Sequence, residues 1–448
     1  MIKNFLQRNS FLTFILFFIF LGSINSQNWI NSKHFPGDGT LRIHKLELDN
    51  SGNVYIGGLL AGVNDTIESY GFYDVFLAKL DRNLSLKWFK QIGGKGFDDL
   101  NLDIVPSGNK VYMVCGAQDS MYISDDDTLK GGESYDAYVL SYFSDGTLDF
   151  AKNIGTGETE QRTTSIDIDN NSDLLISGFF TDSLVLNNDT SLYSAGRDNY
   201  IMKLNNNGEF IWAKVLNGNS DQTRISSVSA YHNSYYVNGY FYDTLEIEVN
   251  NEINKIGSKN SNYSDLFLYK MDYEGNGQWI RRSYGLDDDV TGNITSDGYG
   301  NIYFSGYFQS DTLTFDYDAN TVGSDSVFNK GSFDIYMVKF NRNGNLQWLK
   351  SYGTSNKEYA IEIEENYDNL YLSGYYTDTL AFENDSLISD FTDDRNIFIS
   401  RFDLNGNHLE ADHIIGGDNG SDAARPIALS KANQAYIGGY FKSSTIYV

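Results

Sequence analysis

The residues best suited to chemistry in this sequence are aspartates in short, glycine-rich segments. Carboxylate oxygens are the ligands that hard cations such as Ca²⁺ prefer, and one ion needs several of them. These aspartates are therefore candidate ligand-binding residues, with Ca²⁺ as the one cofactor that they suggest. Alternatively, they cap the backbone of their own segments, which is the interpretation that we prefer. The candidates are Asp98, Asp99, Asp221, Asp287, Asp288 and Asp289.

Patterns typical of enzymes are missing from the sequence. It contains no His-Glu-x-x-His, no Gly-x-Ser-x-Gly, no phosphate loop and no Gly-x-Gly-x-x-Gly. Cys115 is the only cysteine, which excludes an internal disulfide and a multi-cysteine metal site. It lies in an apolar segment and is expected to be a buried strand residue. We predict no catalytic residue and no metal centre.

Composition indicates a folded, acidic protein. The chain has 448 residues, 41% of them hydrophobic, only 3 prolines, and a formal net charge of −27. This is enough apolar material for a large core. The acidic residues are spread along the chain, so they indicate a solvated surface that would oppose binding to nucleic acid or to an anionic membrane.

The first residues resemble an export signal. Lys3 and Arg8 precede an apolar run over residues 11–21, and small residues follow up to Ser26. The run is shorter than the roughly 20 residues of a membrane-spanning helix. We expect a signal peptide over residues 1–26, cleaved after Ser26, and a single domain over residues 27–448. No cysteine lies near the cleavage site, so the protein is expected to be secreted or at the cell surface without lipoprotein acylation.

A repeat dominates the rest of the chain. The segment Asn301-Ile302-Tyr303-Phe304-Ser305-Gly306 recurs in seven copies, anchored at positions 55, 112, 175, 236, 303, 371 and 436. A second alternating segment, such as residues 334–339, follows each of the first six anchors. A third carries Trp and Lys, as at residues 346–350, and a fourth precedes each anchor, as at residues 361–364. Their period-2 patterns predict strands.

These four strands predict a blade of a β-propeller. Turns such as Asn341-Arg342-Asn343-Gly344 join the second and third segments and are typical of hairpins rather than of a calcium loop. Four strands bury one face poorly alone, so about seven units should stack radially. We therefore predict an all-β propeller of about seven four-stranded antiparallel blades. The segment around Trp29 copies the Trp strand and should close the last blade, which would still lack one strand.

The up-and-down order of the strands predicts which face binds a partner. One face receives the tight Asn-Gly turns. The other receives the long insertions after each anchor and the links between blades, and variable loops on a rigid scaffold are where binding tends to occur. The recurring Asp-Thr-Leu of these insertions, as at residues 378–380, is expected to be a structural turn with an inward leucine.

The order Gly-Asn-x-Tyr-x-x-Gly, Asp-x-Phe-x-x-Lys, Trp-x-Lys resembles the bacterial seven-bladed β-propeller repeat family (SBBP-type) of exported proteins, as found in Bacteroidota. The resemblance runs from about Trp29 to the end of the sequence. It implies a surface or secreted module that mediates interaction.

The function expected is therefore binding, without evident catalysis, of an unknown surface protein or glycan by a monomer. Nucleic acid is not an expected partner, nor is membrane insertion after signal cleavage. The alternative is an enzyme: a quinone-dependent (PQQ-like) propeller dehydrogenase, suggested by the segment from Asn205 to Trp212, or a carbohydrate-active propeller. The first lacks its threonine and vicinal cysteines here. A sialidase-like enzyme is disfavoured because the sequence lacks its box spacing and shows no arginine cluster.

Overall fold

All regular elements in the described part of the chain are β-strands, as the sequence predicts. The computed structural model describes residues 18–21, 28–29, 40–64, 67–96, 101–123, 127–155, 159–186, 190–318, 321–389, 395–416, 423–431, 434–440 and 446–447. Within these ranges there is no helix of the length and apolarity that crossing a membrane requires.

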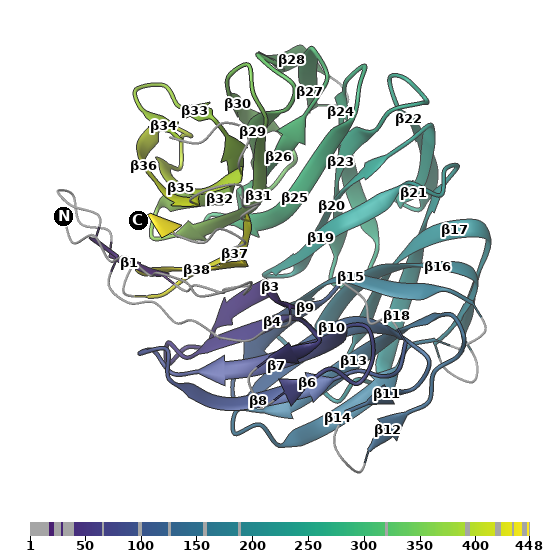
Figure 1. Cartoon of the computed structure of the whole chain (residues 1–448). Coiled ribbons are helices and arrows are strands. Elements are labelled where there is room, and N and C mark those ends of the chain that lie inside the picture. The colour runs from purple at the N-terminus through teal and green to yellow at the C-terminus, as the bar shows by residue number, and fades with distance from the viewer. Residues whose placement is uncertain are drawn as a thin grey trace.

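The molecule is a β-propeller in which six blades are detected, arranged around a central axis (Figure 1). Each blade is an antiparallel sheet whose four main strands follow one another along the chain. The first blade contains β3 (Thr40–Leu48), β4 (Val54–Ala61), β7 (Asp74–Leu80) and β8 (Leu86–Ile92), and the second contains β9 (Asp103–Ser107), β10 (Lys110–Gln118), β13 (Tyr135–Phe143) and β14 (Leu148–Asn153). The third contains β15 (Gln161–Ile168), β16 (Leu174–Val185), β17 (Ser191–Leu204) and β18 (Phe210–Gly218), and the fourth contains β19 (Arg224–Tyr231), β20 (Ser234–Phe241), β23 (Asp265–Asp272) and β24 (Gly277–Tyr284). The fifth contains β25 (Asp289–Ser296), β26 (Ile302–Phe308), β29 (Asp334–Phe340) and β30 (Leu346–Tyr352), and the sixth contains β31 (Glu358–Asn366), β32 (Asn369–Thr377), β35 (Arg395–Asp403) and β36 (His408–Gly416).

The first strand of each blade is the innermost. Successive first strands, from β3 to β31, contact one another around the axis. The connections between second and third strands emerge on one face, together with the links between blades. We call this the insertion face and the opposite one the turn face. Two insertion hairpins, which begin with β21 (Thr244–Val249) and β27 (Thr312–Asp318), pair with β18 and β24 of the preceding blades. Backbone hydrogen bonds therefore join neighbouring blades there.

The remaining insertions also contain short strands. They form the hairpins β5 (Val63–Asn64) with β6 (Ile67–Glu68), β11 (Met121–Tyr122) with β12 (Thr128–Leu129), and β33 (Thr379–Ala381) with β34 (Ser386–Ile388). The partners of β21 and β27 are β22 (Glu252–Gly257) and β28 (Thr321–Phe328). The leucines of three Asp-Thr-Leu turns, Leu245, Leu313 and Leu380, are fully buried, which confirms their predicted inward packing, whereas Leu129 is half-buried.

The glycine of the repeated anchor fits a β-bulge in the first strand. Next to Gly178 and Gly374, the register between first and second strands shifts by one residue. A Cβ atom on Gly374 would lie 1.9 Å from the carbonyl oxygen of Tyr359, and one on Gly178 would lie 2.0 Å from that of Arg162. Glycine recurs at this position because any side chain would collide with the backbone of the first strand.

The Trp and Lys of the repeat hold the turn of the following blade. Trp348 Nε1 and Lys339 Nζ both donate hydrogen bonds to the carbonyl oxygen of Leu404, at 3.2 and 3.0 Å. Gly406 of the same turn has a φ of +75° and lies against the Trp348 ring. The repeated motif is therefore a clamp between blades. The equivalent donors and acceptor in the first two blades are Trp88, Lys79 and Ser144.

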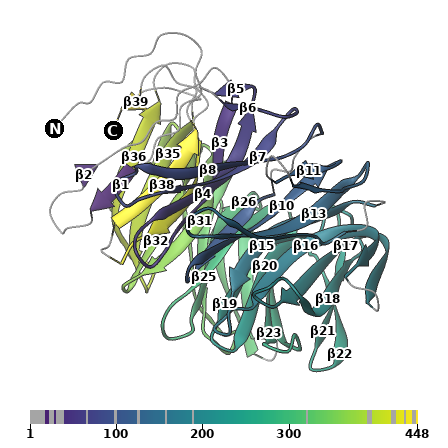
Figure 2. The same ribbon diagram turned by 90° about the horizontal axis from the view of Figure 1, so that it is seen from below.

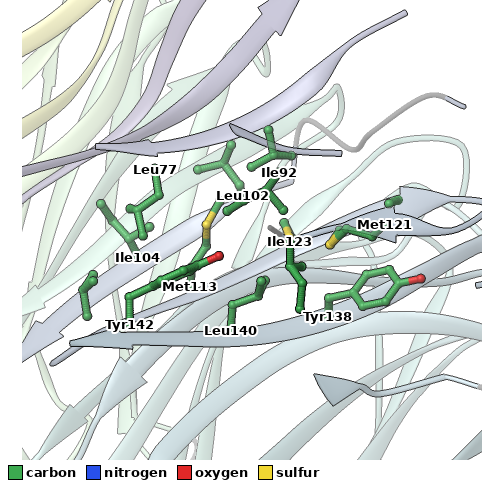
Figure 3. Packing of buried hydrophobic residues seen from close by; sticks show 14 of the residues in the cluster. Leu77, Ile92, Leu102, Ile104, Met113, Met121, Ile123, Tyr138, Leu140 and Tyr142 are labelled. Carbon is green, nitrogen blue, oxygen red and sulfur yellow. The ribbon is translucent and has the colours of Figure 1, made fainter. Parts of the chain in front are cut away.

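Apolar side chains of neighbouring blades interlock between the sheets. In the cluster drawn in Figure 3, Leu77 and Ile92 of the first blade pack with Ile104 and Met113 of the second. Each fully buried side chain of this size stabilises the fold by roughly 1.5–3 kcal/mol. Cys115 is fully buried in the same cluster, which confirms that it is a core residue.

A further four-stranded sheet joins segments from both ends of the sequence. β37 (Ala423–Leu429) pairs with β38 (Gln434–Tyr440), β38 with β1 (Phe18–Leu21), and β1 with β2 (Asn28–Trp29). Figure 2 shows β1 beside β38. The segment that contains Trp29 is thus the outer strand of this sheet, and its neighbour in the sheet, β1, lies within the predicted signal peptide. β39 (Ile446–Tyr447) pairs with β36, as β21 and β27 pair with their preceding blades.

Candidate functional site

The aspartates predicted as ligands lie in separate links between blades. Asp98 and Asp99 lie outside the described residues. Asp221 follows the third blade, Asp287 and Asp288 follow the fourth, and Asp289 is the first residue of β25 in the fifth. Among the residues that the structure describes, no group of three or more His, Cys, Asp or Glu is arranged to hold a metal ion. A ligand role for these aspartates stays a prediction.

The carboxylate oxygens of these aspartates, where they are described, accept hydrogen bonds from neighbouring residues. Asp289 is fully buried, and its Oδ2 accepts a hydrogen bond from Ser310 Oγ at 3.1 Å. Asp288 Oδ1 accepts from the backbone nitrogen and the hydroxyl of Ser264, at 3.1 and 3.2 Å. These contacts fix the path of the link. Similarly, Asp403 Oδ1 accepts from backbone nitrogens of its own Asn-Gly turn, which confirms the hairpin interpretation of that turn.

A polar cavity of about 270 Å³ lies on the axis, lined by side chains of the first strands. Four carboxylates line it: Glu47, Asp103, Asp167 and Glu364. Lys45 is the one basic residue among the described lining residues. The alternating pattern predicted these strands. The polar residues of that pattern face the axis, and no role was predicted for them.

We call this cavity the central channel. Carboxylates in and beside it surround Lys45. Its Nζ lies 2.6 Å from Glu362 Oε1, 3.7 Å from Glu47 Oε1 and 3.8 Å from Asp103 Oδ1. Burial alone would lower the pKa of Lys45, but these charges outweigh it and raise the pKa well above its ordinary value. Burial raises the pKa of Glu47 to about 8, against the opposing effect of Lys45, and that of Asp167 to about 6. The channel therefore retains protons near neutral pH.

Four partly exposed aromatic side chains gather on the insertion face between the fifth and sixth blades. We call Tyr307, Phe333, Tyr359 and Tyr375 the Tyr359 cluster. The ring centroid of Tyr359 lies 4.8 Å from that of Tyr307, 5.3 Å from Phe333 and 4.6 Å from Tyr375. Tyr375 comes directly after the anchor glycine and pairs with Tyr359 across β31 and β32. The repeat itself therefore positions this pair.

Tyr359 also lines a cavity of about 370 Å³ on this face. The polar side chains of Asn356, Lys357, Asp378 and Arg395 contribute to the same lining. The guanidinium carbon of Arg395 lies 4.8 Å from the centroid of the Tyr375 ring. The cavity thus offers one aromatic ring, that of Tyr359, and several hydrogen-bonding side chains to a small ligand.

Two buried carboxyl groups, Asp334 and Glu358, interact between the same two blades. Asp334 Oδ2 accepts from the backbone nitrogen of Lys330 at 3.0 Å, and Glu358 Oε1 accepts from Thr354 Oγ1 at 2.6 Å. Asp334 Oδ1 and Glu358 Oε2 are buried without a hydrogen-bond partner in the described part of the chain. Burial raises the pKa of Asp334 to about 6, and burial with the charge of Asp334 raises that of Glu358 to about 7.

An arginine cluster, which the sequence did not reveal, forms on the insertion face of the third and fourth blades. Arg162, Arg197 and Arg224 surround the ring of Phe179. These arginines are far apart in the sequence and lie in different strands, so no local motif indicates that they meet. The expectation that the protein has no arginine cluster, which was used against a sialidase-like enzyme, was therefore wrong.

No known protein-family pattern matches the chain, so the comparisons do not support membership of the SBBP-type family. An uncharacterized WD repeat-containing protein of Acanthamoeba polyphaga mimivirus is 23% identical over 257 residues, which is 48% of this chain and 18% of that protein. The chain thus aligns with less than a fifth of this relative's length.

Several solved structures align with most of the chain at low sequence identity and low TM-score. A neuraminidase-like protein of a flat-faced bat isolate is 9% identical, with 91% of this chain and 89% of that chain covered and a TM-score of 0.39. A variant of Synechocystis apocarotenoid oxygenase is 9% identical, with 86% and 82% covered and a TM-score of 0.39. A member of the duf4221 family from Bacteroides vulgatus is 10% identical, with 98% and 99% covered and a TM-score of 0.34. These likenesses concern the fold alone.

Proposed function

We propose that this chain is a secreted or cell-surface binding module that takes up a glycan on its insertion face. The observation that carries the proposal is the 370 Å³ cavity beside the Tyr359 cluster. Sugar rings present apolar C–H faces that pack on aromatic rings, and hydroxyl groups that hydrogen-bond to amide and charged side chains. Tyr359, Asn356 and Asp378 offer these two kinds of contact at one site.

Binding is preferred to hydrolysis because of the carboxylates available. Glycoside hydrolysis generally needs two carboxyl groups that flank the scissile bond. Asp378 is the one carboxylate among the described residues that line this cavity. The buried pair Asp334 and Glu358 does not line it, so the site supports recognition of a sugar rather than its cleavage.

The proposal extends to the architecture of the exported protein. We propose that β37 and β38 belong to a seventh blade, which lies between β31 and β3. Contacts of β37 with β31 and with β3 support this placement. Export with cleavage after Ser26 would remove β1, so the strand at Asn28–Trp29 would then move to the edge of β38 and close the ring. We further propose a monomer of SBBP-type ancestry that binds no nucleic acid. Ca²⁺ at the blade links remains part of this proposal.

An array of neutral oligosaccharides tests the proposed function. Cellohexaose, xylohexaose, mannohexaose and chitohexaose would be titrated against the wild-type protein and the Tyr359→Ala and Tyr375→Ala variants. Loss of a central aromatic contact commonly costs about 2 kcal/mol, so affinity for the bound sugar should fall at least tenfold. Tyr367→Ala is the matched control, because Tyr367 is 60% exposed in the loop before β32, on the turn face.

A further inference from the structure

Three arginine side chains stack around one buried ring on the insertion face. The guanidinium carbons of Arg197, Arg224 and Arg162 lie 3.6, 4.9 and 5.9 Å from the ring centroid of Phe179. Arg162 also lies 3.9 Å from the ring centroid of Tyr135. Phe179 is only 2% exposed, so it is a fixed platform for the planar guanidinium groups. Stacking on an aromatic ring restrains planar guanidinium groups, which can still form hydrogen bonds in their own plane.

The arginine cluster occupies the same place in the repeat as the Tyr359 cluster. Phe179 comes directly after the anchor glycine of its blade, as Tyr375 does, and Arg162 pairs with Phe179 as Tyr359 pairs with Tyr375. The two clusters therefore lie on the same face, at equivalent positions of the third and sixth blades.

Two of the three arginines, Arg197 and Arg224, are incompletely neutralised in the described part of the chain. Arg162 Nε forms an ion pair with Glu160 Oε1 at 2.6 Å. Arg224 donates to the backbone carbonyl oxygen of Asp221 at 2.6 Å, which is a neutral acceptor. Neither Arg197 nor Arg224 forms an ion pair within the described part of the chain, and Arg197 Nε is buried there without a hydrogen-bond partner.

The electrostatics favour an anion at this point. Burial, and then the positive charge of Arg224, lower the pKa of Arg197 to about 10. Burial is the larger cause of this shift, and repulsion between the like charges of Arg197 and Arg224 adds to it, against the opposing charges of Glu160 and Asp221. An anion between them would relieve this repulsion. The cluster is unusual on a chain with a net charge of −27, and that background would repel anions elsewhere.

From this geometry we infer that Arg162, Arg197 and Arg224 form an acidic-group subsite, which binds a carboxylate or sulfate of an acidic glycan. The inference rests on the proposed function, because it names the class of glycan that the insertion face takes. Guanidinium groups bind carboxylate and sulfate oxygens through paired N–H···O bonds, which gives both affinity and orientation. The Tyr359 cluster then supplies the stacking contact, and the arginine cluster supplies the preference for an acidic sugar.

Two matched pairs of probes test this inference and identify the acidic group. Hexagalacturonate is compared with its methyl ester, and a κ-carrageenan hexasaccharide with its desulfated form, by titration calorimetry at 50 and 300 mM NaCl. We expect at least a tenfold preference for one acidic probe over its neutral partner, smaller at the higher salt concentration. The preference should disappear in Arg197→Gln and Arg224→Gln and persist in Lys87→Gln, a charge-matched control on an exposed side chain.

The outcomes separate this inference from the proposed function. Folded Arg197→Gln and Arg224→Gln proteins that keep the full acidic preference would overturn the acidic-group subsite and leave glycan binding intact. If these variants do not fold, the salt dependence of the wild-type protein decides the question: an acidic preference that is equally large at 50 and 300 mM NaCl would also overturn the inference. Loss of acidic binding in the arginine variants, with Tyr359→Ala unaffected, would support the subsite and contradict the proposed aromatic site.

Discussion

Replacement of Lys45 by glutamine would test whether the charge balance of the central channel stabilises the propeller. Lys45 Nζ lies within 3.8 Å of carboxylate oxygens of Glu362, Glu47 and Asp103. Its side chain is 17% exposed and that of Glu362 is 6% exposed, so water screens this contact poorly. Removal of one partner from a buried ion pair typically costs about 3–5 kcal/mol. Because the channel is a cavity rather than a dry core, we expect about 3 kcal/mol at neutral pH.

The loss should depend on pH. The pKa of Asp167 is raised to about 6 and that of Glu47 to about 8. Both groups therefore bind a proton more tightly in the folded than in the unfolded chain, and their contribution to stability is lost as the pH rises through about 6 and about 8. At pH 5 Glu47 and Asp167 are largely protonated, so Lys45 opposes less charge than at pH 9. At pH 9 Glu47 and Asp167 are ionised. Removal of the Lys45 charge should then cost about 4 kcal/mol, against about 1 kcal/mol at pH 5.

Urea unfolding, followed by tryptophan fluorescence at pH 5, 7 and 9, measures this dependence. Lys87→Gln is the control, because Lys87 is 49% exposed and pairs only with Asp81 in the described structure. Its effect should stay within about 0.5 kcal/mol at every pH. The double variant Lys45→Gln, Glu362→Gln should recover part of the loss. An equal cost of Lys45→Gln at pH 5 and pH 9 would refute the role of channel charge.

Two further substitutions test the blade interfaces. Gly344→Ala should destabilise the fold by about 1–3 kcal/mol in urea unfolding, because Gly344 has a φ of +79° and a Cβ atom there would lie 2.9 Å from the Trp279 ring. Gly298→Ala, which meets nothing within 4 Å, should change little, and equal effects would contradict the clamp. Glu358→Gln should stabilise the protein by about 2 kcal/mol above pH 8 and little below pH 5, because the wild type loses stability as the pH rises through the raised pKa of Glu358, about 7. Thermal unfolding across this range, with the exposed Glu383→Gln as control, measures the effect, and a gain at pH 5 as large as at pH 9 would argue against it.

The strands and their order were predictable because their signals are local. The anchor glycine, the Asn-Gly turns and the Trp and Lys of the third segment each report on a conformation within one repeat. The structure adds a reason for each residue: the glycine fits a bulge, and Trp348 and Lys339 hold the turn of the next blade. The N-terminal sheet was only partly predictable, because residues 18–21 have the composition of a signal peptide.

The sites were not predictable, because they form between blades. Lys45 meets Glu362 across 317 residues of sequence, and Tyr307 meets Tyr359 only because the fifth and sixth blades lie side by side. The pairing of positions such as Arg162 and Phe179 follows from the bulge register, which the alternation alone does not reveal. The aspartates singled out from the sequence are engaged where they are described, as Asp288 and Asp289 show.

The most direct test of the account is sugar binding by the Tyr359→Ala variant. The wild-type protein should bind at least one oligosaccharide of the array, Tyr359→Ala should bind it at least tenfold more weakly, and Tyr367→Ala should bind it as the wild type does. Tyr367→Ala should unfold at the wild-type temperature, because Tyr367 is largely exposed, and Tyr359→Ala at a lower one, because it loses three ring contacts; binding is measured below both temperatures. A folded Tyr359→Ala protein with wild-type affinity for the sugar would contradict the proposed site.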